Sequence, residues 1–247
     1  MLVLALDSTT RAGSIALLRD GALIDQVVGD AARPHAERLP GDATQLLARH
    51  GFAIADVGLF AVAAGPGSFT GLRIGIAAVQ GLAWASGRPV VGVSALEALA
   101  HTAWRAGLVA GGGRVGVWMD AQRSEVFSAV YAVPPVSTTT GERGLSEIDA
   151  AAVEPPGTGA SRWHAAYIAD PFPIVGDGAI RYAEVLRTSL GDVVRILEPQ
   201  PIAPSIAALA AARYLAGDTG LPHALRPVYV RRPDAELARD KRAQTAP

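Results

Sequence analysis

The stretch GPGSFTGLRIGIAAVQGLAWAS, residues 65–86, decides how the rest of the sequence is interpreted. It follows an apolar run, Val57–Ala64, that is typical of a buried strand, and it predicts a turn into a helix from Thr70 to Ser86. At such a junction, backbone amides and the helix dipole can bind an anion. A tight turn capped by Ser68 or Thr70 explains the same residues, so both interpretations stay open.

Two well-known chemistries do not fit this motif. It lacks the lysine of a Walker A loop, so nucleotide hydrolysis by that route is unsupported. Ser68 does not occupy a nucleophile elbow, because Phe69 and Thr70 separate it from Gly71.

The helix that follows the motif carries one formal charge, Arg73. A helix that is apolar on nearly every side has to be covered on more than one side. One side can pack on its own sheet, and small residues at helical spacing line the other: Gly71, Gly75, Ala78 and either Leu82 or Ala85. We expect a helix of another protein to cover this surface, and the alternative is that a second lobe of the same chain does so.

Around the motif, residues 1–108 predict a mixed sheet with helices on its faces. The predicted elements are strands Leu2–Asp7, Gly13–Leu18, Ala22–Val28 and Val90–Val93, a helix between Pro34 and His50 with Leu39, Ala43, Leu46 and Leu47 on one face, and a helix from Ser94 to about Ala106.

After a run of three glycines, 111–113, the pattern begins again. Strand Arg114–Asp120 ends in aspartate as Leu2–Asp7 does, and each is followed by a turn and a second strand. This repetition predicts two related lobes, residues 1–108 and 114–230, from an internal duplication. Within the second lobe we expect a long surface excursion over 134–159, strands at 172–175 and 193–197, and helices at 179–190 and 205–216.

The end of the chain carries two further expectations. The helix over 205–216, capped by Ser205, is a candidate to pack back on the first lobe. Residues 231–247 form a charged and loosely attached tail, whose arginines and Lys241 are diluted by acidic neighbours. Direct nucleic-acid binding by this tail is therefore less favoured than a solvated surface.

Composition narrows the function classes. The net charge is −1, so no global field draws the chain to nucleic acid, and the absence of cysteine excludes disulfides and thiolate chemistry. The first residues lack the pattern of a signal peptide, and the longest apolar stretch, Ile74 to Ala85, is too short for a membrane span. We expect a cytoplasmic protein with no membrane association.

Few residues have the spacing of a catalytic or metal site. Asp7 and Asp120 lie at matching strand ends, where a carboxylate either holds a hydrated metal near phosphate or caps the amides of the following turn. The five histidines show no metal-ligand spacing. We therefore expect no catalytic residue and no metal site.

Seven segments together resemble the TsaB (YeaZ) family in order and spacing over nearly the whole chain. They are LALDST (4–9), HAERLP (35–40), GPGSFTGLRIG (65–75), GVSALE (92–97), DAQRSEV (120–126), GDG (176–178) and PVYVR (227–231). The resemblance implies an α/β fold of the actin-like, Hsp70-type (ASKHA) class with two RNase H-like lobes. It also implies a non-catalytic subunit that binds and activates the catalytic relative TsaD, beside TsaE, in making threonylcarbamoyladenosine at position 37 of tRNA.

The same resemblance implies where contacts and absences lie. The metal-binding histidines of TsaD fall on Ala95 and Leu99 here, so neither a transferase metal site nor a protease site is expected. Gln122 stands where many relatives have arginine. The contact with TsaD, or with a second copy when TsaD is missing, involves the first two helices of the lobe and the residues His35, Leu39, Ala43, Leu46, Leu47, Gly71, Arg73, Ile74, Gly75, Ala78, Leu82 and Ala85.

The alternative is an independent small-molecule kinase or ATPase. Its nucleotide would contact Asp7, Ser8, Thr9, Gly65, Gly67, Ser68, Gly176 and Gly178. The turn Ser8-Thr9-Thr10 contains no glycine, unlike the phosphate loops of active relatives, which counts against this reading. No tightly held cofactor is expected, and weak nucleotide binding at the partner interface stays compatible with the subunit role.

Overall fold

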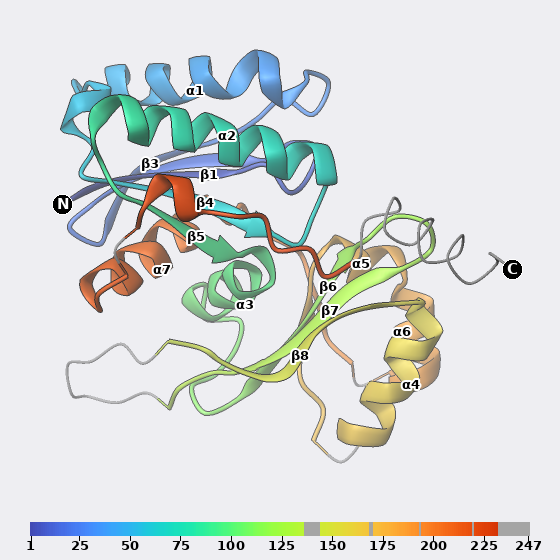
Figure 1. The fold of residues 1–247 in the computed structure, drawn as a ribbon. Coiled ribbons are helices and arrows are strands. Elements are labelled where there is room, and N and C mark those ends of the chain that lie inside the picture. Colours follow the sequence, from blue (N-terminus) through green and yellow to red (C-terminus); the bar gives the residue numbers. More distant parts are fainter. Residues whose placement is uncertain (136–143, 168–169, 193, 219, 232–247) are drawn as a thin grey trace, which may run out of the picture.

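The computed structural model describes residues 1–247 except 136–143, 168–169, 193, 219 and 232–247. Its elements stack as helices, sheet, helices, sheet and helices (Figure 1). The first sheet has the strand order β3-β2-β1-β4-β5, and the second has the order β10-β9-β6-β7-β8. Two similar mixed sheets confirm the predicted actin-like α/β class and agree with an internal duplication.

The first sheet and its helices follow the predicted order closely. They are β1 (Leu2–Asp7), β2 (Ser14–Arg19), β3 (Ala22–Val28), α1 (His35–Arg49), β4 (Leu59–Gly65), α2 (Phe69–Ser86), β5 (Val90–Ser94) and α3 (Ala95–Arg105), with a short 3-10 turn at Ile54–Asp56. Strand β1 pairs antiparallel with β2 and parallel with β4. Pro40 lies inside α1.

Alternate side chains of β1 point to opposite faces of the first sheet, and each face belongs to a different hydrophobic core. Leu4 and Leu6 of β1 pack with α1 and α2, whereas Val3 and Ala5 pack with α3 and α7. Both faces of β1 are buried, which explains why this strand is apolar at every position before Asp7.

The second sheet carries the larger departures from prediction. Its elements are β6 (Arg114–Asp120), β7 (Val126–Ala132), β8 (Ser146–Glu154), α4 (Pro156–Tyr167), β9 (Ile174–Val175), α5 (Asp177–Arg181), α6 (Ala183–Leu190), β10 (Ile196–Leu197) and α7 (Ala203–Leu215), with a 3-10 turn at Pro222–Ala224. The predicted excursion over 134–159 is wrong in its described part, since it contains β8 and the start of α4. The helix predicted over 179–190 is two helices, and Ser205 lies inside α7 rather than at its cap.

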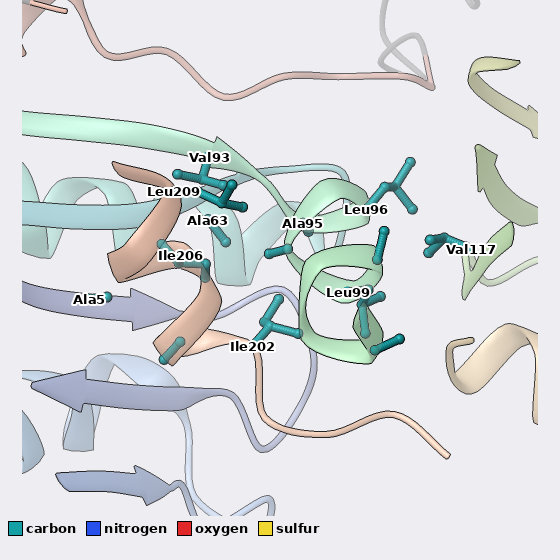
Figure 2. Packing of buried hydrophobic residues seen from close by; sticks show 14 of the residues in the cluster. Ala5, Ala63, Val93, Ala95, Leu96, Leu99, Val117, Ile202, Ile206 and Leu209 are labelled. Carbon is teal, nitrogen blue, oxygen red and sulfur yellow. The ribbon is translucent and has the colours of Figure 1, made fainter. Parts of the chain in front are cut away.

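Helices α3 and α7 form a middle layer that both sheets share. Their apolar side chains join the inner faces of the two sheets in one continuous core, in which Leu96 and Leu99 of α3 lie between Ala5 of the first sheet and Val117 of the second (Figure 2). The space between the lobes is therefore largely filled by protein.

The end of the described chain returns to the first sheet. Helix α7 packs on β1, β2, β4 and β5, which agrees with the expected return of this helix. Beyond it, Val90 N–H donates to Gly220 O at 2.8 Å and Val228 N–H donates to Ala64 O at 2.7 Å. Within the predicted lobe of residues 114–230, α7, Gly220 and Val228 therefore contact the first sheet, and the last strand of the second sheet is β10. The predicted tail lies outside the described residues, apart from Arg231, which pairs with Glu125.

In the described part of the chain, none of the helices has the length and hydropathy that crossing a bilayer requires.

Candidate functional site

The glycines of the motif at 65–75 serve close contacts within the chain. A side chain at Gly65 would collide with Val228 O, and one at Gly67 would lie 2.5 Å from Thr9 Cβ. The loop is also tied to the turn after β1, because Ser68 N–H donates to Thr9 O at 2.9 Å. Ser68 caps α2 by accepting from Gly71 N–H at 3.2 Å, so the tight-turn interpretation of the motif is confirmed.

Gly71 and Gly75 let α2 lie directly on the turn after β1. A Cβ at Gly71 would overlap Ser8 O, and a Cβ at Gly75 would overlap Ser8 Oγ. Both glycines are buried, so they face the chain's own Ser8 and not a foreign helix. This corrects the expectation that these two small residues form a partner surface.

The other predicted interface residues divide in the same way. The predicted interface residues of α1 are buried as well: His35, Leu39, Ala43, Leu46 and Leu47. The four apolar ones belong to the same core as the strands of the first sheet. Side chains with so little accessible surface, at most 9% for His35, offer almost nothing to a partner in this conformation. The members that keep accessible surface are Arg73, Ile74, Ala78, Leu82 and Ala85.

The exposed face of α2 is made of residues next to the predicted ones and is rotated about the helix axis from the predicted face. Ala77, Gly81 and Ala85 are exposed at a spacing of four residues, and the side chain beside them, Trp84, is 76% exposed. Nothing lies within 4 Å of a Cβ placed on Gly81. We call Ala77, Gly81, Trp84 and Ala85 the α2 face. Sequence reasoning did not single out Trp84, although a lone tryptophan among small helix residues was a usable signal.

An aromatic cluster marks the beginning of α2. The rings of Phe69 and Tyr229 lie 5.5 Å apart, and the Arg73 guanidinium lies 3.8 Å from the centre of the Phe69 ring. Arg73 Nε also donates to Tyr229 Oη at 3.1 Å. The returning segment of the chain therefore holds the start of this helix in place.

A cavity of about 350 Å³ lies between the lobes. Its lining comes from the end of β1 and the turn after it, from β3, α3, β6 and α5, and from the segment before α7: Asp7, Thr9, Thr10, Ala12, Gly13, Ser14, Val28, Leu99, Met119, Asp177, Pro199, Gln200, Pro201 and Ile202. Of the eight predicted nucleotide contacts, only Asp7 and Thr9 line it.

The remaining predicted nucleotide residues lie elsewhere. Ser8 and Gly65 are buried, Gly67 is half-buried and Ser68 is exposed at the start of α2. Gly176 and Gly178 are buried against β6, where a Cβ on Gly178 would lie 2.7 Å from the Met119 carbonyl carbon. These glycines permit close packing of α5 on β6, and the structure does not gather the eight residues around one ligand.

Asp7 and Asp120 hold the turns that follow their strands. Thr9 N–H donates to Asp7 Oδ1 at 2.8 Å, and Gln122 N–H donates to Asp120 Oδ1 at 3.0 Å. The capping interpretation is therefore confirmed for both lobes. Burial raises the pKa of Asp7, an effect that the hydrogen bonds from Thr9 partly offset.

A buried polar network supports the turn after β1 from the side of α1. Arg38 donates to Ala12 O and to His35 Nδ1, the latter at 2.9 Å. Because His35 Nδ1 accepts, His35 Nε2 is assigned as the donor to Thr10 O at 2.8 Å. Asp42 balances the Arg38 charge at 3.1 Å. His35 and Arg38 of α1 thus hold the turn after β1 in place.

The two positions aligned with metal-binding histidines carry apolar side chains in the core. Ala95 is fully buried and Leu99 is 5% exposed, and both belong to the core that joins the two sheets. Neither side chain has an electron pair to offer a metal.

Comparisons with known proteins agree with this architecture. A family model described as "TsaD: tRNA N6-adenosine threonylcarbamoyltransferase" matches residues 29–246. The tRNA threonylcarbamoyladenosine biosynthesis protein TsaB of Escherichia coli is 39% identical over 131 residues, which are 53% of this chain and 55% of that protein. The matched segment therefore spans about half of that relative.

Solved structures extend the likeness to nearly the full chain. YeaZ from Pseudomonas aeruginosa is 31% identical with a TM-score of 0.75, covering 92% of this chain and 99% of that one. A polyphosphate/ATP-glucomannokinase from Arthrobacter is 14% identical with a TM-score of 0.50, covering 87% and 99%, and shows only that the fold is shared. Within the wider group that the TsaD model describes, this chain belongs to the TsaB (YeaZ) family.

Proposed function

We propose that this chain is a non-catalytic subunit in the synthesis of tRNA threonylcarbamoyladenosine, and that it binds and activates a TsaD partner through the α2 face. The proposal rests on membership of the TsaB family and on one structural observation, the exposure of Trp84 on a helix of small residues. The family relation suggests the reaction, and the exposed face suggests the mode of action.

The α2 face has the features of a helix-docking site. Small residues at Ala77, Gly81 and Ala85 allow a partner helix to approach closely, and Trp84 supplies a large apolar side chain for the centre of the contact. Arg73, one turn before Ala77, adds a charge at one end of the face. A monomer gains nothing from keeping a tryptophan 76% exposed, whereas an interface does.

Three observations favour a non-catalytic role over the alternative of a kinase or ATPase. The glycines of the motif pack against other parts of the same chain, the described residues that line the cavity include no basic side chain, and the positions of the TsaD metal ligands carry Ala95 and Leu99. The filled space between the sheets also disfavours the closure of two lobes around a substrate.

The wider assembly follows from the same proposal. TsaE is a further partner, tRNA binds only to the complete complex, and two copies of this chain pair through the α2 face when TsaD is missing. Assembly on tRNA places the chain in the cytoplasm.

The experiment compares Trp84→Ala with Leu215→Ala. Both remove a large exposed apolar side chain, but Leu215, 79% exposed, lies on α7 on the opposite side of the first sheet (Figure 1). Calorimetric titration with the cognate TsaD should show binding weakened roughly thirtyfold by Trp84→Ala, which corresponds to about 2 kcal/mol for a central interface residue. Leu215→Ala should bind as the unchanged protein does.

Reconstituted tRNA modification provides the second measurement. Activity should require this chain and should fall with Trp84→Ala at limiting protein concentration. Full activity from TsaD, TsaE and the adenylate-forming enzyme without this chain would contradict the subunit role. Equal binding by both variants would contradict the α2 face as the contact.

A further inference from the structure

We propose that the cavity between the lobes binds a small organic cation of the diamine or polyamine class, with its ammonium groups at Asp7 and Asp177 and its methylene chain against the apolar wall. This inference is independent of the α2 face and of the proposed subunit role. It rests on the acidic and apolar side chains that line one cavity of about 350 Å³, which is partly open to solvent.

Asp7 presents an unused acceptor to this space. Its side chain is 4% exposed, and both of its hydrogen bonds, from Thr9 N–H at 2.8 Å and Thr9 Oγ1 at 2.6 Å, end on Oδ1. The second carboxylate oxygen therefore has no donor within the described part of the chain. Because this oxygen keeps some accessible surface, it can accept from a ligand in the cavity, and a cationic N–H is the donor that stabilises a carboxylate most.

Asp177 contributes a second carboxylate from the other lobe, and unlike Asp7 it is exposed. The backbone N–H groups of Asp120 and Gly178 both donate to Asp177 Oδ1, at 3.0 and 2.9 Å. Its other oxygen again is left for a partner in the cavity. Two carboxylates from different lobes thus line the same space, each with one oxygen held by its own turn.

The charges around the cavity select a cation over an anion. The described residues that line it include two carboxylates and no lysine, arginine or histidine. Arg38 and His35 lie behind the turn at 10–13, where Arg38 pairs with Asp42. Arg181, beside Asp177, pairs with Asp120 at 2.6 Å. A triphosphate would meet uncompensated like charge here, whereas an ammonium group would meet two acceptors.

The rest of the lining fits a methylene chain and not a hydrated metal ion. Val28, Leu99, Met119, Pro199, Pro201 and Ile202 form the apolar wall, and Figure 2 shows Leu99 and Ile202 next to each other between the sheets. A hydrated ion would leave this wall in contact with its water shell. An alkyl ammonium compound buries its chain on the wall while its charged ends reach the carboxylates.

Isothermal calorimetry with putrescine (1,4-diaminobutane) on the full chain tests the proposal. Butan-1-ol supplies the same chain without charge, and Mg·ATP supplies the rival ligand. We expect putrescine to bind with a Kd below about 1 mM, and butan-1-ol and Mg·ATP to give no heat from the cavity.

Three variants locate the binding. Asp7→Asn keeps the shape and the bonds from Thr9 but removes the charge, and should weaken putrescine binding at least tenfold. Val28→Lys places a cation at the rim, where Val28 is 55% exposed, and should weaken binding similarly without threatening the fold. Asp170→Asn, at an exposed carboxylate paired with Arg114 outside the cavity, should bind putrescine unchanged.

The outcomes separate cleanly. Loss of binding in Val28→Lys and Asp7→Asn with retention in Asp170→Asn supports the site, and if Asp7→Asn fails to fold, Val28→Lys alone decides. Absence of putrescine binding at 10 mM, equal binding of butan-1-ol, unchanged binding in Val28→Lys, or binding of Mg·ATP in its place would each overturn the proposal.

Discussion

Two glycines on one helix should respond in opposite ways to the same substitution. Gly71 and Gly81 both lie in α2, and both become alanine with the same gain in intrinsic helix propensity, about 1 kcal/mol or less. Their surroundings differ completely. A Cβ on Gly71 would lie 2.1 Å from Ser8 O, whereas a Cβ on Gly81 would have no neighbour within 4 Å.

The magnitude follows from these distances. Real Cβ atoms stay at least 3.0 Å from other heavy atoms, so Gly71→Ala must push the helix away from the turn by about 0.9 Å, the difference between 3.0 and 2.1 Å. Such overpacking costs about 1–3 kcal/mol, which exceeds the gain in helix propensity. Gly71→Ala should therefore lower the free energy of unfolding by about 1 kcal/mol or more, and Gly81→Ala should raise it by about 0.5–1 kcal/mol.

Differential scanning calorimetry and urea unfolding of the two variants provide the test. For a chain of this size, 1 kcal/mol corresponds to about 2–4 °C in Tm. The two variants should thus differ by roughly 4–8 °C, with Gly81→Ala above the unchanged protein and Gly71→Ala below it. If Gly71→Ala proved as stable as Gly81→Ala, the close approach of α2 to Ser8 would be refuted.

Two further predictions concern buried polar groups. The Ser8 hydroxyl is fully buried without a partner, so Ser8→Ala should raise the free energy of unfolding by about 1 kcal/mol in urea titrations. Ser14→Ala is the matched control and should lower it by a similar amount, because Ser14 Oγ accepts from Ala203 N–H at 3.2 Å; equal effects would contradict the assignment. Burial lowers the pKa of His101 from 6.5 to about 4 in the folded protein. Between pH 6.5 and 4, His101 is therefore protonated in the unfolded chain and neutral in the folded chain. Stability should fall as pH drops through this window by up to about 1.4 kcal/mol per pH unit, and His101→Gln should flatten that slope, whereas an unchanged slope would exclude His101 as its source.

The first sheet was predictable because its local signals agree with its environment. Strand β1 has the predicted bounds, Leu2–Asp7, since an apolar run ending in a turn residue can only be buried in this way. Repetition of the same pattern at Arg114–Asp120 correctly predicted β6, the first strand of the second sheet along the chain. Patterns that recur along a chain report architecture even where single residues differ.

Helix α4 could not be predicted from local composition. Its first residues, from Pro156 to Gly159, include a proline and two glycines, which are typical of a loop. Gly159 is needed because the helix passes close to Trp118, where a Cβ would lie 3.2 Å from the ring. Tertiary packing of Trp163 in the core of the second lobe, and not helix propensity, holds this segment.

The sequence did not show which face of each helix is covered by the chain itself and which face is exposed. Apolar spacing in α1 correctly placed Leu39 and Leu46 on one face, but spacing does not tell whether the chain itself or another protein covers that face. In α2 the apolar residues lie on nearly every side, so the sequence did not show which side of the helix is exposed. Only the position of Ser8, distant in sequence, shows which small residues face inward.

The return of residues 203–230 to the first sheet has a consequence for biosynthesis. While the first sheet emerges from the ribosome, the part of its inner side that α7 covers stays exposed, because α7 follows about a hundred residues after the last strand of that sheet. A product truncated before Ala203 would keep this apolar surface uncovered, and chaperones should capture it rather than let it accumulate as a smaller folded protein.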